Sequence, residues 1–130
     1  MNKEWESVKL FHKKFNHPIG KDPQCMELGR AEKRYNWMLE EINEFKEAAK
    51  AGDIVEQADA MIDVIYFALG TLVEMGIKPD RLFEIVQQAN MSKLWEDGKP
   101  HYAKDGKTIK PPTWEDPHDK LKEAINKMGF

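Results

Sequence analysis

The apolar and polar positions along the chain predict a succession of helices. In four segments an apolar residue recurs every three to four positions, which is the spacing of one helix face. These segments cover residues 3–15, 28–51, 53–76 and about 79–94. Gly52 and Asp53 separate the second segment from the third, as a helix stop followed by the N-cap of the next helix. A connection this short predicts an antiparallel pair of long helices.

Beyond Trp95 the composition shifts to Asp, Gly, Lys and Pro. The dipeptide Asp105-Gly106 is typical of a tight hairpin turn, and residues 119–128 predict a last short helix.

We therefore expect an all-α fold, a bundle of four to five helices with a long antiparallel central pair, plus a small C-terminal β-hairpin or extended tail. Residues 1–95 are expected to form the helical domain. Residues 96–130 are expected to form a tail, with hairpin and short helix, packed on the same domain.

The third segment is apolar on every face, yet Asp59 and Asp63 lie in its middle, one turn apart. At about 100° per residue, Glu56 joins them within roughly 60° of arc. No Lys or Arg occurs between Lys50 and Lys78. Buried acids are paired, protonated or bound to metal. Capped or partner-neutralised aspartates are one interpretation of this stripe, and a bound cation is the one we favour.

The second segment carries the acidic run Glu40-Glu41-Ile42-Asn43-Glu44. By itself this run is typical of a solvated helix face. An antiparallel neighbour, however, brings Glu41 and Glu44 near Glu56, Asp59 and Asp63. Carboxylates without His or Cys suit hard cations, namely Mg²⁺ or Mn²⁺, and Mg²⁺ commonly binds substrate phosphates as well. The pattern therefore predicts chemistry on a phosphate ester or anhydride.

The composition of the chain limits the classes of partner and the compartment that we expect. The net charge of −3, from 20 basic and 23 acidic residues, shows no footprint for a nucleic acid polymer. The single cysteine fits a reducing compartment, and neither a signal segment nor a membrane span is indicated. We expect a cytoplasmic protein. Aromatic residues at helical spacing are interpreted as core rather than as stacking partners of a base, namely Trp5, Phe11, Phe15 and Trp37.

Together, the acidic run and the acids on the following apolar helix resemble the signature of the MazG-type all-α nucleoside triphosphate pyrophosphohydrolases. The similarity covers roughly residues 1–95. Asn90-Met91-Ser92-Lys93 and the Asp-Gly-Lys and Lys-Pro elements of the tail further resemble the phosphoribosyl-ATP pyrophosphatase-like branch. The resemblance implies Mg²⁺-dependent hydrolysis of the α–β phosphoanhydride of a nucleoside triphosphate, of a house-cleaning type, to the monophosphate and pyrophosphate. It also implies a homodimer or a dimer of dimers.

The resemblance assigns roles to individual residues. Glu41 and Glu44 match metal ligands, and Glu40 matches an acid that orients or deprotonates the attacking water. Asn90 and Lys93 would hold phosphates or sugar. Arg34, Lys104 and Lys107 are further candidates for the phosphate charge.

The second pair of metal ligands has two possible registers. Glu56-x-x-Asp59 satisfies the family motif literally. The stretch that begins at Asp63 instead resembles the one that follows the family's metal-binding Asp, and in that register Ala60 stands where the family has Glu. Both aspartates therefore remain candidates, with Glu56 as third choice.

Two alternative functions stay open. One is phosphoribosyl-ATP pyrophosphohydrolysis. The other is a non-catalytic helical dimerisation module whose acids hold a structural ion.

Overall fold

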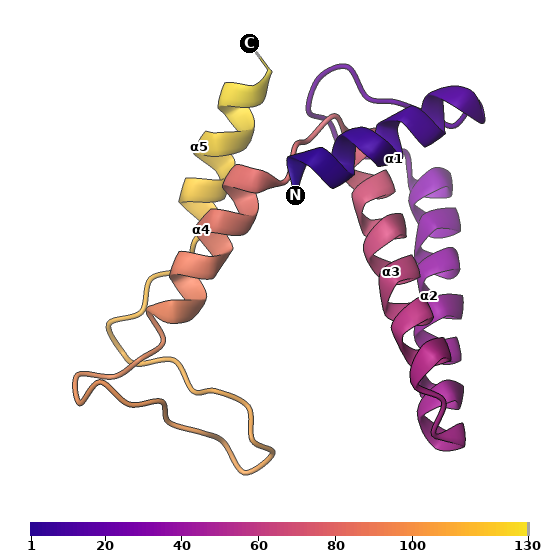
Figure 1. Cartoon of the computed structure of the whole chain (residues 1–130). Coiled ribbons are helices and arrows are strands. Elements are labelled where there is room, and N and C mark those ends of the chain that lie inside the picture. The colour runs from indigo at the N-terminus through magenta and orange to yellow at the C-terminus, as the bar shows by residue number, and fades with distance from the viewer. Residues whose placement is uncertain (130) are drawn as a thin grey trace. The chain divides into compact units, whose positions relative to one another are not determined.

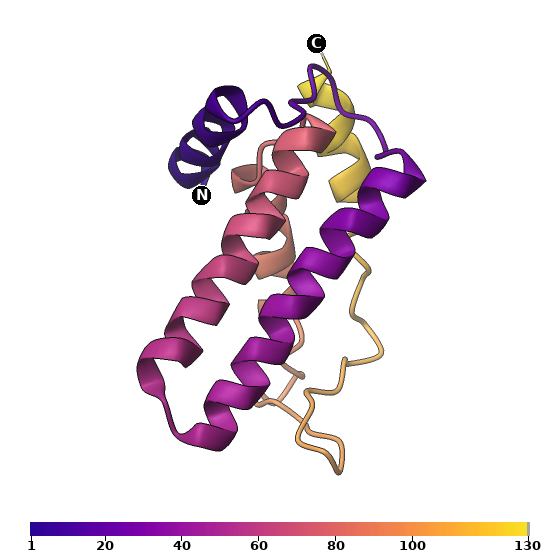
Figure 2. The same cartoon turned by 90° about the vertical axis from the view of Figure 1, so that its right-hand side faces the viewer.

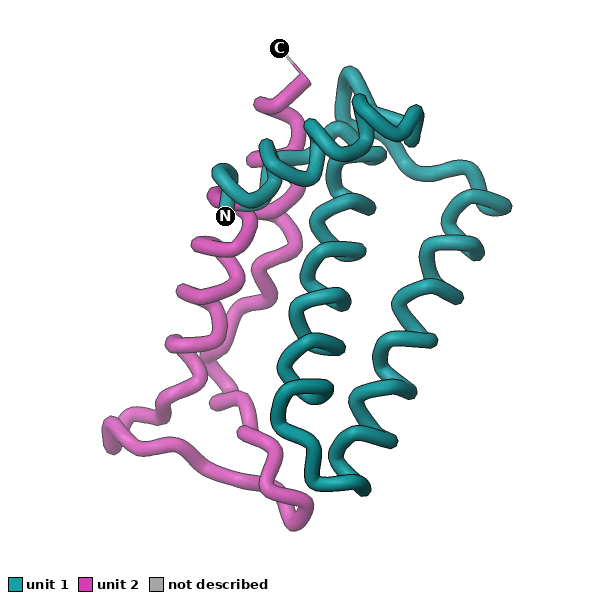
Figure 3. The backbone as a smooth tube through the Cα atoms, turned by 45° about the vertical axis from the view of Figure 1, so that its right-hand side comes forward, with its two compact units in different colours: residues 1–79 teal, residues 80–130 magenta. Residues whose placement is uncertain are grey.

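The computed structural model describes residues 1–129 and folds them into five α-helices (Figure 1). The helices are α1 (Asn2–Lys14), α2 (Leu28–Ala51), α3 (Ile54–Met75), α4 (Asp80–Met91) and α5 (His118–Met128). The predicted all-α class is confirmed. The chain divides into two compact units, one of residues 1–79 with α1 to α3, and one that begins at Asp80 and contains α4 and α5 (Figure 3).

The predicted C-terminal hairpin is wrong. Within residues 1–129 no strand forms, and this region holds a single antiparallel bridge between Tyr102 and Thr108. Asp105 accepts a hydrogen bond from the backbone N–H of Lys107, so the local turn chemistry is present. The flanking residues are mostly exposed, and a two-stranded ribbon without an apolar face to bury is at best marginally stable. The turn therefore closes a loop rather than a sheet.

The helices α2 and α3 form the predicted antiparallel pair (Figure 2). Gly52 ends α2 in the left-handed conformation, with a φ of 68° that a residue with a side chain rarely adopts. Asp53 then caps α3, because its side chain accepts a hydrogen bond from the backbone N–H of Glu56 at 3.1 Å. These two adjacent residues set the register of the long pair at its closed end.

Helix α1 packs on the C-terminal half of α3. Trp5 and Val8 of α1 form one buried cluster with Leu69 and Val73 of α3. This cluster leaves the N-terminal half of α3, where the acids lie, outside the tightest part of the core.

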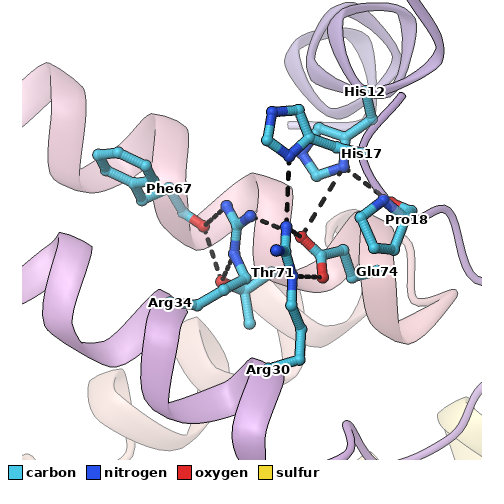
Figure 4. Close-up of polar contacts among 8 residues, drawn as sticks. All are labelled: His12, His17, Pro18, Arg30, Arg34, Phe67, Thr71 and Glu74. Carbon is cyan, nitrogen blue, oxygen red and sulfur yellow. Dashed lines mark hydrogen bonds and ion pairs between the residues drawn. The ribbon is translucent and has the colours of Figure 1, made fainter. Parts of the chain in front are cut away.

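A buried ionic network joins α2 to α3 at the open end of the pair (Figure 4). Both carboxylate oxygens of Glu74 are bound by arginines of α2. Arg30 donates to them at 2.8 and 3.0 Å, and Arg34 donates at 2.6 Å. Arg34 also donates to the hydroxyl of Thr71 and to the carbonyl oxygen of Phe67. Burial alone would raise the pKa of Glu74, but the hydrogen bonds and charges of the two arginines hold it below its usual value.

In the second unit, α4 and α5 contact each other, and Trp114 in the segment between them donates its indole N–H to the carbonyl oxygen of Ala89 at 2.7 Å. The two helices thus share one small core. The expected division after residue 95 stays a prediction.

Along the described chain, no single helix is both long and apolar enough to cross a membrane. Only α3 and α4 taken together, across the break between them, reach that length and composition. Core helices of soluble proteins also reach it.

Much of α3 stays exposed, although a helix that is apolar on every face needs cover on every face. Neither α1 nor α2 covers Ile54, Val55, Ile62 or Ile65, and Ile62 is 60% exposed. Contiguous exposed apolar surface of this kind marks an interaction site.

We predict that the chain self-associates through this face of α3, so that light scattering gives at least twice the monomer mass of 15.1 kDa. Ile62→Lys places a charge on the face and is expected to shift the mass towards the monomer. Leu10→Lys on α1, at a position 53% exposed, is the matched control and should leave the assembly intact. A wild-type monomer at high micromolar concentration would contradict the prediction.

We further predict that Glu74→Gln destabilises the fold by about 3–5 kcal/mol, because it leaves two arginines, one of them buried, without their counter-charge. Denaturant unfolding followed by circular dichroism measures the change. The control is Glu6→Gln, which removes the exposed ion pair with Lys78 at 3.6 Å and should cost no more than about 0.5 kcal/mol. Equal effects of the two substitutions would show that the network is not what joins the helices.

Candidate functional site

The α2–α3 pair brings four of the predicted acids into one layer. Glu41 of α2 and Asp63 of α3 are half-buried, while Glu44 and Asp59 are exposed. Burial first, then a side-chain hydrogen bond with Glu44, and then the negative charges of Asp63, Glu44 and Asp59 raise the pKa of Glu41 to about 7. Glu44, Asp59 and Asp63 therefore lie close enough to act on Glu41.

One oxygen in this layer lacks a partner. Glu41 Oε2 is buried and makes no hydrogen bond, and in residues 1–129 the only other buried side-chain atom of this kind is Trp5 Nε1. A buried polar atom without a partner is costly, and for a carboxylate a proton or a cation removes the cost. An all-oxygen donor set around such an atom fits a hard divalent cation.

The carboxylates do not form a finished metal cage. Nowhere in the described chain do three or more His, Cys, Asp or Glu side chains adopt an arrangement that could hold a metal ion. Mg²⁺ commonly keeps several waters and takes phosphate oxygens as further ligands. The arrangement thus fits a cation that binds together with a phosphorylated substrate, with the acids turning towards it.

Two further predicted acids lie at the margin of the layer. Glu56 is exposed in the first turn of α3, where its backbone N–H meets the capping Asp53, and it is not among the leading causes of the Glu41 shift. Glu40 is exposed on α2, about 100° round the helix from Glu41.

The candidate phosphate-binding residues fall into two groups. Arg34 belongs to the buried network with Glu74, where three of its nitrogens are already hydrogen-bonded. The other four belong to the second unit. Asn90 is exposed on α4, Lys93 lies over the ring of Trp114 at 5.9 Å, and Lys104 and Lys107 are exposed in the loop.

An aromatic cavity lies beside the acid layer. It has a volume of about 260 Å³ and is lined by Phe11, His12, His17, Arg34, Trp37, Tyr66 and Phe67. Trp37 precedes Glu41 by four residues and Phe67 follows Asp63 by four residues, so both rings project one turn, about 6 Å, from the acids. Their centroids are 6.0 Å apart.

The spacing of the aromatic residues predicts that Trp37 and Phe11 lie in the core, whereas in the structure both line this cavity, and Phe11 is 37% exposed. The sequence pattern also did not assign a role to Glu74. The available signal was an acid in the last turn of an apolar helix, together with two arginines four residues apart on the helix that pairs with it.

Comparison with known proteins identifies a family and a solved structure that this chain resembles. The phosphoribosyl-ATP pyrophosphohydrolase family matches residues 8–90. A crystal structure of a protein from Exiguobacterium sp. 255-15, provisionally named an NTP pyrophosphohydrolase, is 34% identical in sequence. The match covers 95% of this chain and 94% of that one, with a TM-score of 0.55. No curated protein matches the chain significantly.

The matched residues contain the whole acid layer and both helices that carry it. The resemblance inferred from the acidic run is confirmed. The chain belongs to the phosphoribosyl-ATP pyrophosphohydrolase family, within the MazG-type all-α superfamily, and is a hydrolase of the pyrophosphate linkage of nucleotides.

Proposed function

We propose that the protein hydrolyses the α–β phosphoanhydride of a nucleoside triphosphate, in a reaction that depends on Mg²⁺ and for which Mn²⁺ can substitute. The products are a nucleoside monophosphate and pyrophosphate. The observation that carries the proposal is the buried, unpartnered oxygen of Glu41, flanked by Glu44, Asp59 and Asp63 on the facing helices.

Glu41, Glu44, Asp59 and Asp63 would hold the cation. The charges that act most on Glu41 include both aspartates and not Glu56, which supports the register in which Asp59 and Asp63 supply the second ligand pair. Glu56 has its own explanation as an acid in the first turn of α3, where the helix dipole favours it.

When bound, Mg²⁺ offsets phosphate charge and lowers the pKa of a coordinated water. We assign to the exposed carboxylate of Glu40 the role of accepting a proton from the attacking water, as the family resemblance implies. The water oxygen then forms a bond to phosphorus, the α–β bridging bond breaks, and pyrophosphate leaves with the electron pair of that bond. Carboxylates repel phosphates, so the acids of the layer would keep the phosphates in line for this displacement only through the cation that they hold.

The remaining phosphate charge needs cations. We assign Lys93, Lys104 and Lys107 to it, with Asn90 as a neutral donor to phosphate or sugar. Lysines act on phosphates as mobile point charges, and the family resemblance is what suggests these residues for the role.

Phosphoribosyl-ATP remains an equally consistent substrate, because the matching family bears its name. Both substrates present the same anhydride to the acid layer, so the acids do not distinguish between them.

The proposal predicts that chelator abolishes pyrophosphate release from a panel of nucleoside triphosphates and that Mg²⁺ restores it. Asp63→Asn, like Glu41→Gln, should lower kcat by at least about a hundredfold, because each removes a ligand of the cation. Glu56→Gln on the same helix is the matched control and should retain most of the activity.

An active Asp63→Asn enzyme together with an inactive Glu56→Gln enzyme would move the second ligand pair to Glu56 and Asp59. Full activity in excess chelator would refute the metal dependence altogether.

The pKa of Glu41, about 7, predicts that Mg²⁺ competes with a proton. Below pH 7 the carboxyl of Glu41 is protonated and must lose its proton to bind the ion. The affinity for Mg²⁺ should therefore fall by up to about tenfold for each pH unit below 7, and should be nearly constant above pH 7. Without metal, in chelator, the effect of pH on folding stability is the opposite. Stability decreases as the pH rises towards 7, because the unfolded chain releases the proton of Glu41 more readily than the folded chain does. Titration calorimetry with Mg²⁺ between pH 5.5 and 8.5 measures the first effect, and equal affinities at pH 6 and 8 would contradict it.

A further inference from the structure

The aromatic cavity beside the acid layer carries an inference that rests on the proposed function and deepens it. Two ring pairs line it: Trp37 with Phe67, and Phe11 edge-on to Tyr66 at 5.7 Å between centroids. A cavity lined mainly by aromatic rings suits a planar aromatic ligand. It lies one turn from the acids that would hold the phosphates, so a bound nucleotide would place its base here.

His17 lines this cavity, and local backbone geometry holds it there. Asn16 has a φ of 58°, so the chain turns back directly after α1. The backbone N–H of His17 donates to the carbonyl oxygen of His12 at 2.8 Å, and its ring stacks on Phe11 with 5.8 Å between centroids and 20° between planes. The imidazole of His17 therefore lines the cavity together with the aromatic rings.

The network around Glu74 determines which nitrogen of His17 carries the proton. Arg30 Nη2 lies 3.3 Å from His17 Nδ1, and a guanidinium can only donate (Figure 4). Nδ1 of the neutral ring is consequently the acceptor, and the proton lies on Nε2. Because two hydrogen bonds to Glu74 hold Arg30 in place, the ring keeps this tautomer. The nitrogen left for a ligand is a donor.

We propose that His17 is a specificity-determining residue that donates a hydrogen bond from Nε2 to the edge of the base, so that the site favours bases with a carbonyl oxygen over bases with an amino group at the same position. A carbonyl accepts this hydrogen bond, whereas an amino group brings a second donor against the first. Arg30 and Glu74 act through His17 as positioning residues.

The test measures the affinities of two matched pairs of nucleoside monophosphates by calorimetry. UMP and CMP differ by an oxo or amino group at one ring carbon, and so do IMP and AMP. The oxo member of each pair is expected to bind about five- to tenfold more tightly. His17→Phe keeps the stacking ring but removes the donor, and should bring both ratios close to one. His118→Phe, the same change at an exposed histidine of α5, should leave the ratios unchanged.

The outcomes separate the two proposals. Equal or reversed affinities in the wild-type protein, unchanged ratios in His17→Phe, or no binding of any of the four at millimolar concentration would overturn the role of His17. His17→Leu is the second removal variant should the Phe variant fail to fold, as judged by circular dichroism. Pyrophosphate release from triphosphates is measured separately, and its absence would refute the proposed function while the binding ratios still decide the inference.

Discussion

The paired arginines of α2 around Glu74 of α3 are the interaction on which the geometry of the first unit depends. They fix the open end of the long helix pair, while Gly52 and Asp53 fix its closed end. Between two fixed ends neither helix can slide or rotate independently. The acid layer therefore keeps its alignment even though its own charges repel, and the energy that opposes this repulsion comes from outside the layer.

The position of the core follows from the same arrangement. The most buried cluster lies where α1 crosses the C-terminal half of α3, and the acid layer lies outside it. Glu44 and Asp59 remain in contact with water there, while Glu41 and Asp63 are half-buried. Such a site combines a mild loss of solvation, which strengthens attraction to a cation, with enough hydration for charged groups to be tolerated.

The sequence was sufficient for the elements whose boundaries depend on local chemistry. Gly52, Asp53 and Gly76 mark helix ends because left-handed backbone and side-chain capping are properties of single residues. The acids could be placed together because an antiparallel pair follows from a short connection. The Glu74 network and the aromatic cavity depend on which rotamers meet across helices distant in sequence, which periodicity does not encode. The hairpin was predicted from its turn alone, and the missing element was an apolar face to stabilise the strands.

The layers along α2 and α3 follow one another at intervals of one to two helical turns, with carboxylates, then aromatic rings, then the arginine network. Each layer is built from both helices, so the spacing between the layer residues must match on the two helices. Insertion of one residue between Trp37 and Glu41 would turn the carboxylates of α2 by about 100° relative to its ring and so separate the two layers. An insertion in the exposed loop that holds Asp105 and Gly106 would instead leave all three layers intact. We therefore expect the fold to tolerate changes of length in its loops, and changes in the interiors of the two long helices only by substitution.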